Sequence, residues 1–263
     1  MIIPFSKYNG AGNDFVLVDN RQDDIRLTAD QIAHICHRRF GVGADGLILL
    51  GAPADGYDFV MQYFNSDGLP ADMCGNGARC IVAFAHTLGF GHPVDGKPTF
   101  LFLAGDGPHQ AEIIRFSPVS QSGLVTIHMK DVDNITSCLD GWLLNTGVPH
   151  YVQFVNNLDT LDVAGEGRRI RHLSQFGPQG ANVNFVQLQT DGHLDVRTYE
   201  RGVEDETWAC GTGVTASAIV TGCNNIRTRG GDFSVSFQRT ANTATAIRLT
   251  GPVALNFIGQ INL

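Results

Sequence analysis

Two cysteines of this sequence lie in the same short pattern, Cys-Gly-x-Gly, at positions that differ by 136 residues. Residues 74–77 read Cys-Gly-Asn-Gly, and residues 210–213 read Cys-Gly-Thr-Gly. Small and apolar residues follow each copy over 78–88 and 214–222, which predicts two buried helices that begin near the cysteines. Backbone N–H groups and the positive helix dipole at such a start stabilise a thiolate and bind a carboxylate. Each copy therefore predicts a base beside an anion site.

The pair Cys74 and Cys210 predicts inversion at a carbon atom. One thiolate removes the α-proton of an amino acid, and a thiol on the opposite face returns a proton. The helix ends would stabilise the negative charge that develops on the substrate carboxylate. Pyridoxal phosphate, the common alternative, needs a Schiff-base lysine, and none of the three lysines lies beside a phosphate-binding motif. A single Cys-Gly-x-Gly would more often be an inert buried cysteine in a turn, but the repeated pattern favours a cofactor-free racemase or epimerase.

The two cysteine patterns belong to a longer internal repeat with the same offset. Asp-Gly occurs at 55–56 and again at 191–192, and each is typical of a hairpin turn. The segments 59–64 and 194–199 follow these turns and predict strands. We therefore expect two structurally similar halves. Many short strands between few helices predict an α+β fold rather than a doubly wound sheet.

The ordinary elements and the composition limit the alternatives. Thr28 and Gln31 form a capping-box pattern before a predicted helix over 29–39. His34 and His37 would share a face of this helix, but no second ligand cluster follows, so no metal site is expected. The net charge of −8 disfavours a nucleic-acid partner. We find no signal-peptide pattern and no membrane-length apolar run, so we expect a soluble cytoplasmic protein, no membrane partner and six free thiols.

The segments around Cys74 and Cys210 closely resemble the two cysteine motifs of the diaminopimelate epimerase family. The first cysteine motif of that family matches Phe-Asn-Ser-Asp-Gly at 64–68 and Met-Cys-Gly-Asn-Gly-Ala-Arg-Cys at 73–80. Its second motif matches Tyr-Glu-Arg-Gly at 199–202 and Glu-Thr-Trp-Ala-Cys-Gly-Thr-Gly at 206–213. The resemblance extends over nearly the whole chain, with further matches at 7–15, 180–185 and 251–253.

The resemblance implies two pseudo-symmetric domains, each a curled mixed or antiparallel sheet around a central helix, with the active site in the cleft between them. On this basis we expect an N-terminal half of residues 1–117 plus 252–263 and a C-terminal half of residues 118–251. The implied reaction interconverts LL- and meso-2,6-diaminopimelate for lysine and peptidoglycan synthesis, without cofactor or metal. Homodimers are usual in the family, so we expect a homodimer whose other partner is a small amino-acid substrate.

By matching position, Cys74 and Cys210 are the two catalytic residues, and His150 is an accessory residue beside them. The residues implied to bind the substrate are Asn13, Asn65, Gly75, Asn76, Asn182, Glu200, Arg201, Gly211 and Thr212. Three departures from the family concern recognition of the distal end of the substrate. They are Val148 in place of an asparagine, Gly46 in place of a glutamine found in some members, and one extra residue within 202–207.

Simpler explanations exist for several of these residues. Glu200 and Arg201 could be an exposed charged pair, which contributes little to stability. The three asparagines could be turn residues, and His150 could be structural. Another cofactor-free racemase, or a small-carboxylate isomerase on the same scaffold, remains the alternative activity. A binding protein that keeps only the fold would be expected to lack one of the two cysteines, and both are present.

Overall fold

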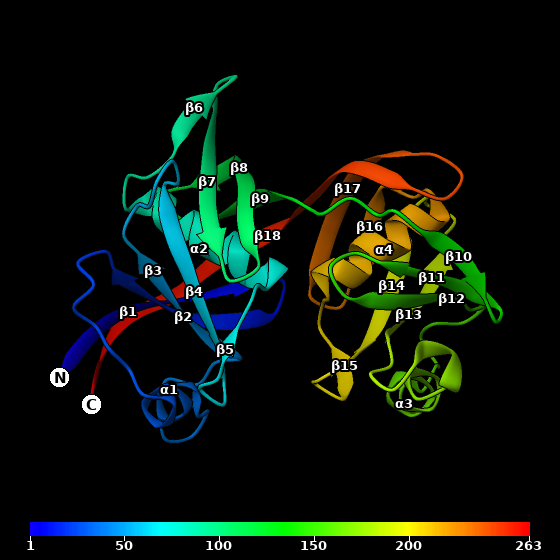
Figure 1. Ribbon diagram of the computed structural model, residues 1–263, viewed down its shortest axis with the longest axis horizontal. Coiled ribbons are helices and arrows are strands. Elements are labelled where there is room, and N and C mark those ends of the chain that lie inside the picture. Colours follow the sequence, from blue (N-terminus) through cyan, green and yellow to red (C-terminus); the bar gives the residue numbers. More distant parts are fainter. The chain divides into compact units, whose positions relative to one another are not determined.

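The chain forms two units of similar construction in the computed structural model, which describes residues 1–263 (Figure 1). Unit 1 comprises Met1–Ile127 and Gly251–Leu263, and unit 2 comprises His128–Thr250. The sequence placed the first boundary at 117/118, ten residues earlier. Residues 118–127 lie in unit 1 because strand β9 (Ser122–His128) pairs with strand β8 (Gly107–Ser117) in a hairpin.

The two units share most of their order of elements: in each, two adjacent strands and a helix are followed by three strands and a second helix. Unit 1 contains β1 (Ile2–Gly10), β2 (Asn13–Asn20), α1 (Ala29–Cys36), β3 (Gly46–Gly51), β4 (Phe59–Asn65), β5 (Pro70–Ala71), α2 (Gly75–Thr87), β6 (His92–Val94), β7 (Lys97–Ala104), β8 and β9. Unit 2 contains β10 (Ile135–Cys138), β11 (Gly141–Asn145), β12 (Pro149–Phe154), α3 (Val163–Arg171), a 3₁₀ turn (Ser174–Phe176), β13 (Asn182–Leu188), β14 (Leu194–Glu200), β15 (Asp205–Thr207), α4 (Gly211–Thr221), β16 (Asn225–Thr228) and β17 (Gly231–Arg239). The last strand, β18 (Ala244–Asn262), contributes to both units.

The sheet pairings repeat as well. β2 and β3 are parallel, and so are β12 and β13. β3 pairs antiparallel with β4, and β13 pairs antiparallel with β14. β3 and β13 begin at residues 46 and 182, and α2 and α4 begin at 75 and 211, so both pairs keep the 136-residue offset. Mixed sheets with four α-helices confirm the predicted α+β class.

Each unit encloses one helix, α2 or α4, among its own strands (Figure 1). All residues of α2 from Asn76 to Ala85 are buried, and so are Gly211 and the run from Gly213 to Val220 in α4. Helices that are apolar all round are stable only where packing covers every face. The small residues that follow each cysteine therefore make these two helices the centre of their units.

A second helix covers the other face of each sheet. In unit 1 the alternate residues Leu47 and Leu49 of β3 pack with Ile32 and Ile35 of α1. Ile48 of the same strand approaches Gly77 of α2 instead. Because successive side chains point to opposite faces, a strand covered on both sides is apolar throughout, and all six residues of β3 are buried.

Helix α1 is shorter than the sequence predicted. The capping box of Thr28 and Gln31 is present, but the helix ends at Cys36 rather than near residue 39. After His37 the chain turns back, and Val42 donates a backbone hydrogen bond to the carbonyl of Ile35 at 2.8 Å. This turn places Arg38 outside the helix, beside two aspartates that are described below.

None of the helices combines the length and hydropathy needed to cross a membrane.

Candidate active site

Cys74 and Cys210 are the N-cap residues of the two enclosed helices. Their backbones are extended, and their carbonyls accept the first helical hydrogen bonds, from Ala78 at 2.7 Å and Val214 at 2.8 Å. Neither helix has a side-chain cap, which Ser, Thr, Asp or Asn would normally provide. The intrahelical ladder does not use the N–H groups of the first turn. The positive end of each helix therefore lies directly beside a sulfur atom.

Packing limits the space at the second glycine of each pattern, most severely at Gly213. A Cβ atom at Gly213 would lie 2.3 Å from Asn184 Oδ1 and 3.2 Å from Thr198 Oγ1. A Cβ at Gly77 would lie 2.9 Å from the Ile48 side chain. A Cβ at Gly75, by contrast, would meet no atom within 4 Å. Packing thus explains the glycine that ends the pattern, whereas no neighbouring atom requires glycine at 75.

Gly213→Ala is expected to destabilise the protein by about 1–3 kcal/mol, because the new methyl group overlaps the buried Asn184 amide. Gly75→Ala is the matched control and should leave the free energy of unfolding nearly unchanged or slightly higher, since alanine favours helix. Urea denaturation of both variants measures the difference. Equal stability of the two variants would contradict the packing role of Gly213.

In unit 1, two predicted substrate-binding residues, Asn13 and Asn76, lie together beside the first cysteine. Asn13 Oδ1, at the start of β2, is 3.6 Å from Cys74 Sγ and 3.4 Å from Asn76 Nδ2. Asn76 Oδ1 in turn accepts a hydrogen bond from Arg79 Nη2 at 2.7 Å. Arg79 is 0% exposed, and although burial lowers its pKa to about 10, it remains charged at neutral pH.

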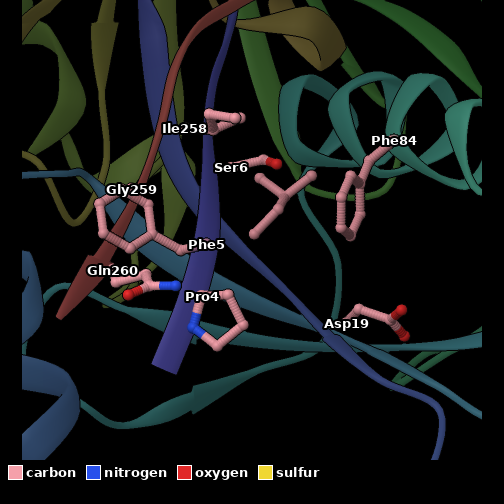
Figure 2. A pocket seen from close by; sticks show the side chains of 9 residues that line it. Pro4, Phe5, Ser6, Asp19, Phe84, Ile258, Gly259 and Gln260 are labelled. Carbon is pink, nitrogen blue, oxygen red and sulfur yellow. The ribbon is translucent and has the colours of Figure 1, made fainter. Parts of the chain in front are cut away.

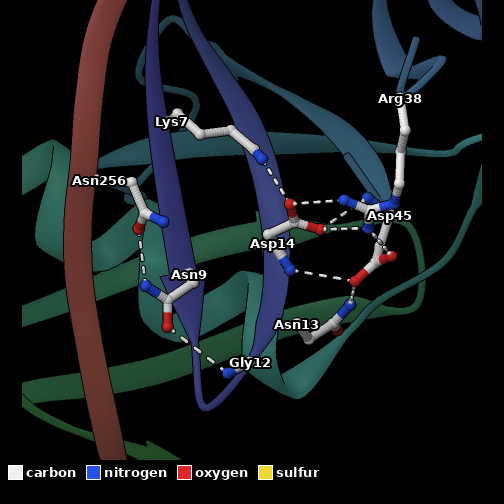
Figure 3. Close-up of polar contacts among 8 residues, drawn as sticks. All are labelled: Lys7, Asn9, Gly12, Asn13, Asp14, Arg38, Asp45 and Asn256. Carbon is white, nitrogen blue, oxygen red and sulfur yellow. Dashed lines mark hydrogen bonds and ion pairs between the residues drawn. The ribbon is translucent and has the colours of Figure 1, made fainter. Parts of the chain in front are cut away.

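A group of charged residues holds Asn13 from the other side (Figure 3). Its amide nitrogen donates to Asp45 Oδ2 at 2.5 Å, and Arg38 Nη2 donates to Asp45 Oδ1 at 2.6 Å. Arg38 also binds both oxygens of Asp14, which forms a salt bridge with the buried Lys7. Burial alone would raise the pKa of Asp14, but Arg38 and Lys7 lower it to about 2. No pattern in the sequence distinguishes the members of this group.

In unit 2, Asn182, Arg201 and His150 lie together at the ends of β13, β14 and β12. The backbone N–H of Arg201 donates to Asn182 Oδ1 at 2.7 Å, and Asn182 Nδ2 is 3.3 Å from His150 Nε2. Asn184 Nδ2 lies 3.1 Å from His150 Nδ1. Burial lowers the pKa of His150 to about 3, so the ring is neutral at pH 7.

Thr146, which no sequence pattern distinguishes, holds the start of α4. Thr146 in the β11–β12 turn donates a hydrogen bond from Oγ1 to the carbonyl of Thr212 at 2.9 Å. The Thr212 hydroxyl lies 3.4 Å from Cys210 Sγ. Cys210 is only 5% exposed. These contacts fix the first turn of α4 against the sheet that carries His150 and Asn182.

The remaining predicted residues have plainer surroundings. Asn65 ends β4, is exposed, and accepts a hydrogen bond from the Tyr63 hydroxyl at 3.0 Å. Glu200 ends β14 and is half-buried. Among the three departures, Gly46 is required by packing, since a Cβ there would lie 2.5 Å from the Phe64 carbonyl oxygen. The longer 202–207 stretch comprises the end of the β14–β15 turn and strand β15, and Glu204 in the turn pairs with Arg171 of α3 at 2.7 Å.

Unit 1 also has a surface pocket of about 510 Å³ (Figure 2). Residues of β1, β2, α2 and β18 line it, among them Pro4, Phe84 and Ile258. Its one charged residue, Asp19, forms a salt bridge with Arg21 at 2.6 Å. None of the predicted site residues lines this pocket, so it is separate from the group around Cys74.

Comparisons with known proteins identify the family. A family model described as diaminopimelate epimerase matches residues 5–106 and 142–255. A diaminopimelate epimerase of Flavobacterium psychrophilum is 44% identical over 260 residues, covering 95% of this chain and 97% of the relative. One of Aquifex aeolicus is 38% identical over 284 residues, covering 98% and 97% of the two chains.

Solved structures with low sequence identity share the fold. A phenazine biosynthesis protein of the PhzF family from Bacillus anthracis has a TM-score of 0.73 at 14% identity, with both chains fully covered. A hydroxyproline epimerase from Agrobacterium vitis has a TM-score of 0.68 at 16% identity, covering 100% of this chain and 93% of the other. The fold, the repeated cysteine-capped helices and the extended sequence identity agree that this chain belongs to the diaminopimelate epimerase family and is an isomerase.

Proposed function

We propose that this protein interconverts LL- and meso-2,6-diaminopimelate by two-base proton transfer, with Cys74 and Cys210 as the acid and the base. The observation that carries the proposal is that each cysteine is the N-cap of an enclosed helix, in the same place of a repeated unit. The relatives named diaminopimelate epimerase support the choice of substrate.

In the proposed reaction one sulfur gains a proton and the other loses one, so that the total number of protons on the two sulfurs does not change. The thiolate of one cysteine takes the α-proton, and the electron pair of the broken C–H bond spreads onto the substrate carboxylate as an enediolate. N–H groups at the helix starts, from Gly75, Asn76, Gly211 and Thr212, would donate to this oxygen pair as its charge grows. The thiol of the other cysteine then gives its proton to the opposite face of the carbon. The two sulfurs end with their protonation states exchanged.

The residues of unit 2 suit recognition of the distal end of the substrate. Arg171, Arg197 and Arg227 form salt bridges with carboxylates of the protein, whereas Arg201 has no carboxylate partner. A guanidinium binds a carboxylate through two parallel hydrogen bonds. Asn182 holds the backbone N–H of Arg201 and so fixes the strand end from which this side chain projects. We therefore assign Arg201 to the distal carboxylate of diaminopimelate.

Exchange of the α-hydrogen in deuterated water tests the substrate. Both LL- and meso-diaminopimelate are expected to lose their α-proton NMR signal, while L-lysine, which lacks the distal carboxylate, should exchange on the order of a hundredfold more slowly, since Arg201 would be left unpaired. L-proline is included to test the alternative activity, a cofactor-free racemase that acts on a different amino acid. Faster exchange of proline or lysine than of diaminopimelate would overturn the assignment of the substrate, while the cysteine chemistry would remain.

A further inference from the structure

The polar side chains beside Cys74 form a continuous chain of contacts whose two ends have a fixed polarity. At one end, Arg79 can only donate, and it donates to Asn76 Oδ1. At the other end, the carboxylate of Asp45 accepts from Asn13 Nδ2. The oxygen and nitrogen of an isolated amide are easily interchanged in a structure. Here an arginine and a carboxylate determine the orientation of both amides.

The two ends require the same orientation of Asn13. Because Asn76 Oδ1 faces Arg79, its amide nitrogen is directed at Asn13 Oδ1, 3.4 Å away. Because Asn13 Nδ2 faces Asp45, its oxygen is the atom that lies 3.6 Å from Cys74 Sγ. An amide oxygen accepts a hydrogen bond from a thiol but is repelled by a thiolate.

Asp45 is itself fixed at both oxygens. Oδ1 accepts from Arg38 at 2.6 Å, and Oδ2 accepts from the backbone N–H of Asp14 at 3.1 Å as well as from Asn13. The backbone N–H of Asp45 returns a hydrogen bond to Asp14 Oδ1 at 3.1 Å. These contacts on both oxygens hold the carboxylate beside the Asn13 amide (Figure 3).

We propose that Asp45 is a positioning residue for the epimerase reaction: it keeps the oxygen of Asn13 facing Cys74, which favours the thiol form of Cys74 and so biases the free protein towards the state in which Cys74 is the proton donor. This inference rests on the proposed function, but it concerns the protonation state of Cys74 in the protein without substrate. Arg79 and Cys80, both on α2, also interact electrostatically with Cys74. Arg79 favours the thiolate, and Asn13 opposes it.

Asp45→Asn tests the proposal. The oxygen of the new amide is drawn to Arg38, so its nitrogen faces Asn13, which must then turn its own oxygen away from Cys74. The pH midpoint of Cys74 alkylation by iodoacetamide, followed by mass spectrometry of the Cys74 peptide, is expected to fall by about one unit, the worth of one hydrogen bond. Asn13→Ala should lower the midpoint in the same way. Asp45→Asn should add no further shift in the Asn13→Ala background.

Asp14→Asn is the matched control. It makes the same change of charge in the same cluster but leaves the Asn13–Asp45 hydrogen bond in place, so the midpoint should stay near that of the wild type. Equal shifts in Asp45→Asn and Asp14→Asn would overturn the proposal. If Asp45→Asn does not fold, Asn13→Ala decides alone: an unchanged midpoint would overturn the proposal, and a lower one would support it.

The two proposals fail in different measurements. Alkylation midpoints are recorded without substrate, so a wrong substrate leaves them as predicted. Diaminopimelate could exchange its α-hydrogen while the pH midpoint of Cys74 alkylation is unchanged in Asp45→Asn. In that case the proposed function stands and the positioning role of Asp45 is lost. The alkaline limb of the pH profile of kcat/KM reports the group that must be protonated and gives a second readout; in Asp45→Asn it should move to lower pH, in the same direction as the midpoint.

Discussion

Cys74→Ala and Cys210→Ala are each expected to lower the rate of inversion of diaminopimelate by at least about a thousandfold, within the usual range for loss of an acid–base group. Each variant removes the group that serves one face of the α-carbon, and an alanine can neither take nor give a proton. Circular dichroism or chiral chromatography of the product measures inversion directly. Unaltered inversion in either variant would rule out the two-base mechanism.

The single-cysteine variants allow a sharper test than loss of activity. The cysteine that remains can still exchange the α-hydrogen with solvent on its own face, without inversion. Cys74→Ala and Cys210→Ala should therefore exchange different stereoisomers, one the LL isomer and the other the meso isomer. Cys223→Ala is the matched control, since Cys223 lies outside both cysteine patterns and its sulfur donates to the backbone carbonyls of Gly192 and Asn225. Exchange of both isomers by both variants would contradict the assignment of one face to each cysteine.

Arg201→Ala is expected to reduce kcat/KM for diaminopimelate by roughly two to three powers of ten. The distal carboxylate of the substrate would lose its partner, which costs about 3–5 kcal/mol where the pair is largely buried. Steady-state kinetics with LL-diaminopimelate measure the effect. Arg201→Lys should recover part of the loss, because lysine keeps the charge but cannot form two parallel hydrogen bonds.

A surface arginine provides the control for Arg201. Arg169 on α3 is 61% exposed in its side chain and pairs with Glu166 one turn away. Exposed pairs of this kind contribute little, so Arg169→Ala should retain the kinetics of the wild type. If Arg201→Ala behaved like Arg169→Ala, the distal carboxylate would have to bind elsewhere, and a substrate without that group would become the better candidate.

Much of the fold was predictable because it is encoded in local patterns. The capping box at Thr28, the strands over 59–64 and 194–199, and the two apolar helices were all confirmed, because each depends on neighbouring residues. The end of α1 was not predictable, since it depends on Val42 and Gly43 returning to the carbonyl of Ile35. The assignment of residues 118–127 to unit 1 depends on the β8–β9 hairpin and on β18, which lies more than a hundred residues later.

The candidate site was predictable only in its most repetitive part. The cysteine patterns gave the two helix starts, and the resemblance to a family gave the asparagines and Arg201, whose roles stay predictions. Asp45 was passed over because a carboxylate before a strand has no distinctive pattern, and its partner Arg38 was expected inside a helix. Arg79 offered a signal that was not used: it is the one charged residue in the apolar run of α2. Thr146 has no signal of its own, because its partner Thr212 is 66 residues away.

The two-part strand β18 has a consequence for synthesis of the chain. Its first residues pair with β17 in unit 2, and residues from Gly251 onward pair with β9 and β1 in unit 1. Unit 2 is thus inserted into unit 1, whose last strand leaves the ribosome after unit 2. Domains tend to fold as units during translation, N-terminal ones first. Here the order is reversed: unit 2 can be complete while the nascent unit 1 still exposes an edge of β1, which makes unit 1 the part that needs protection from aggregation until β18 has paired with β1.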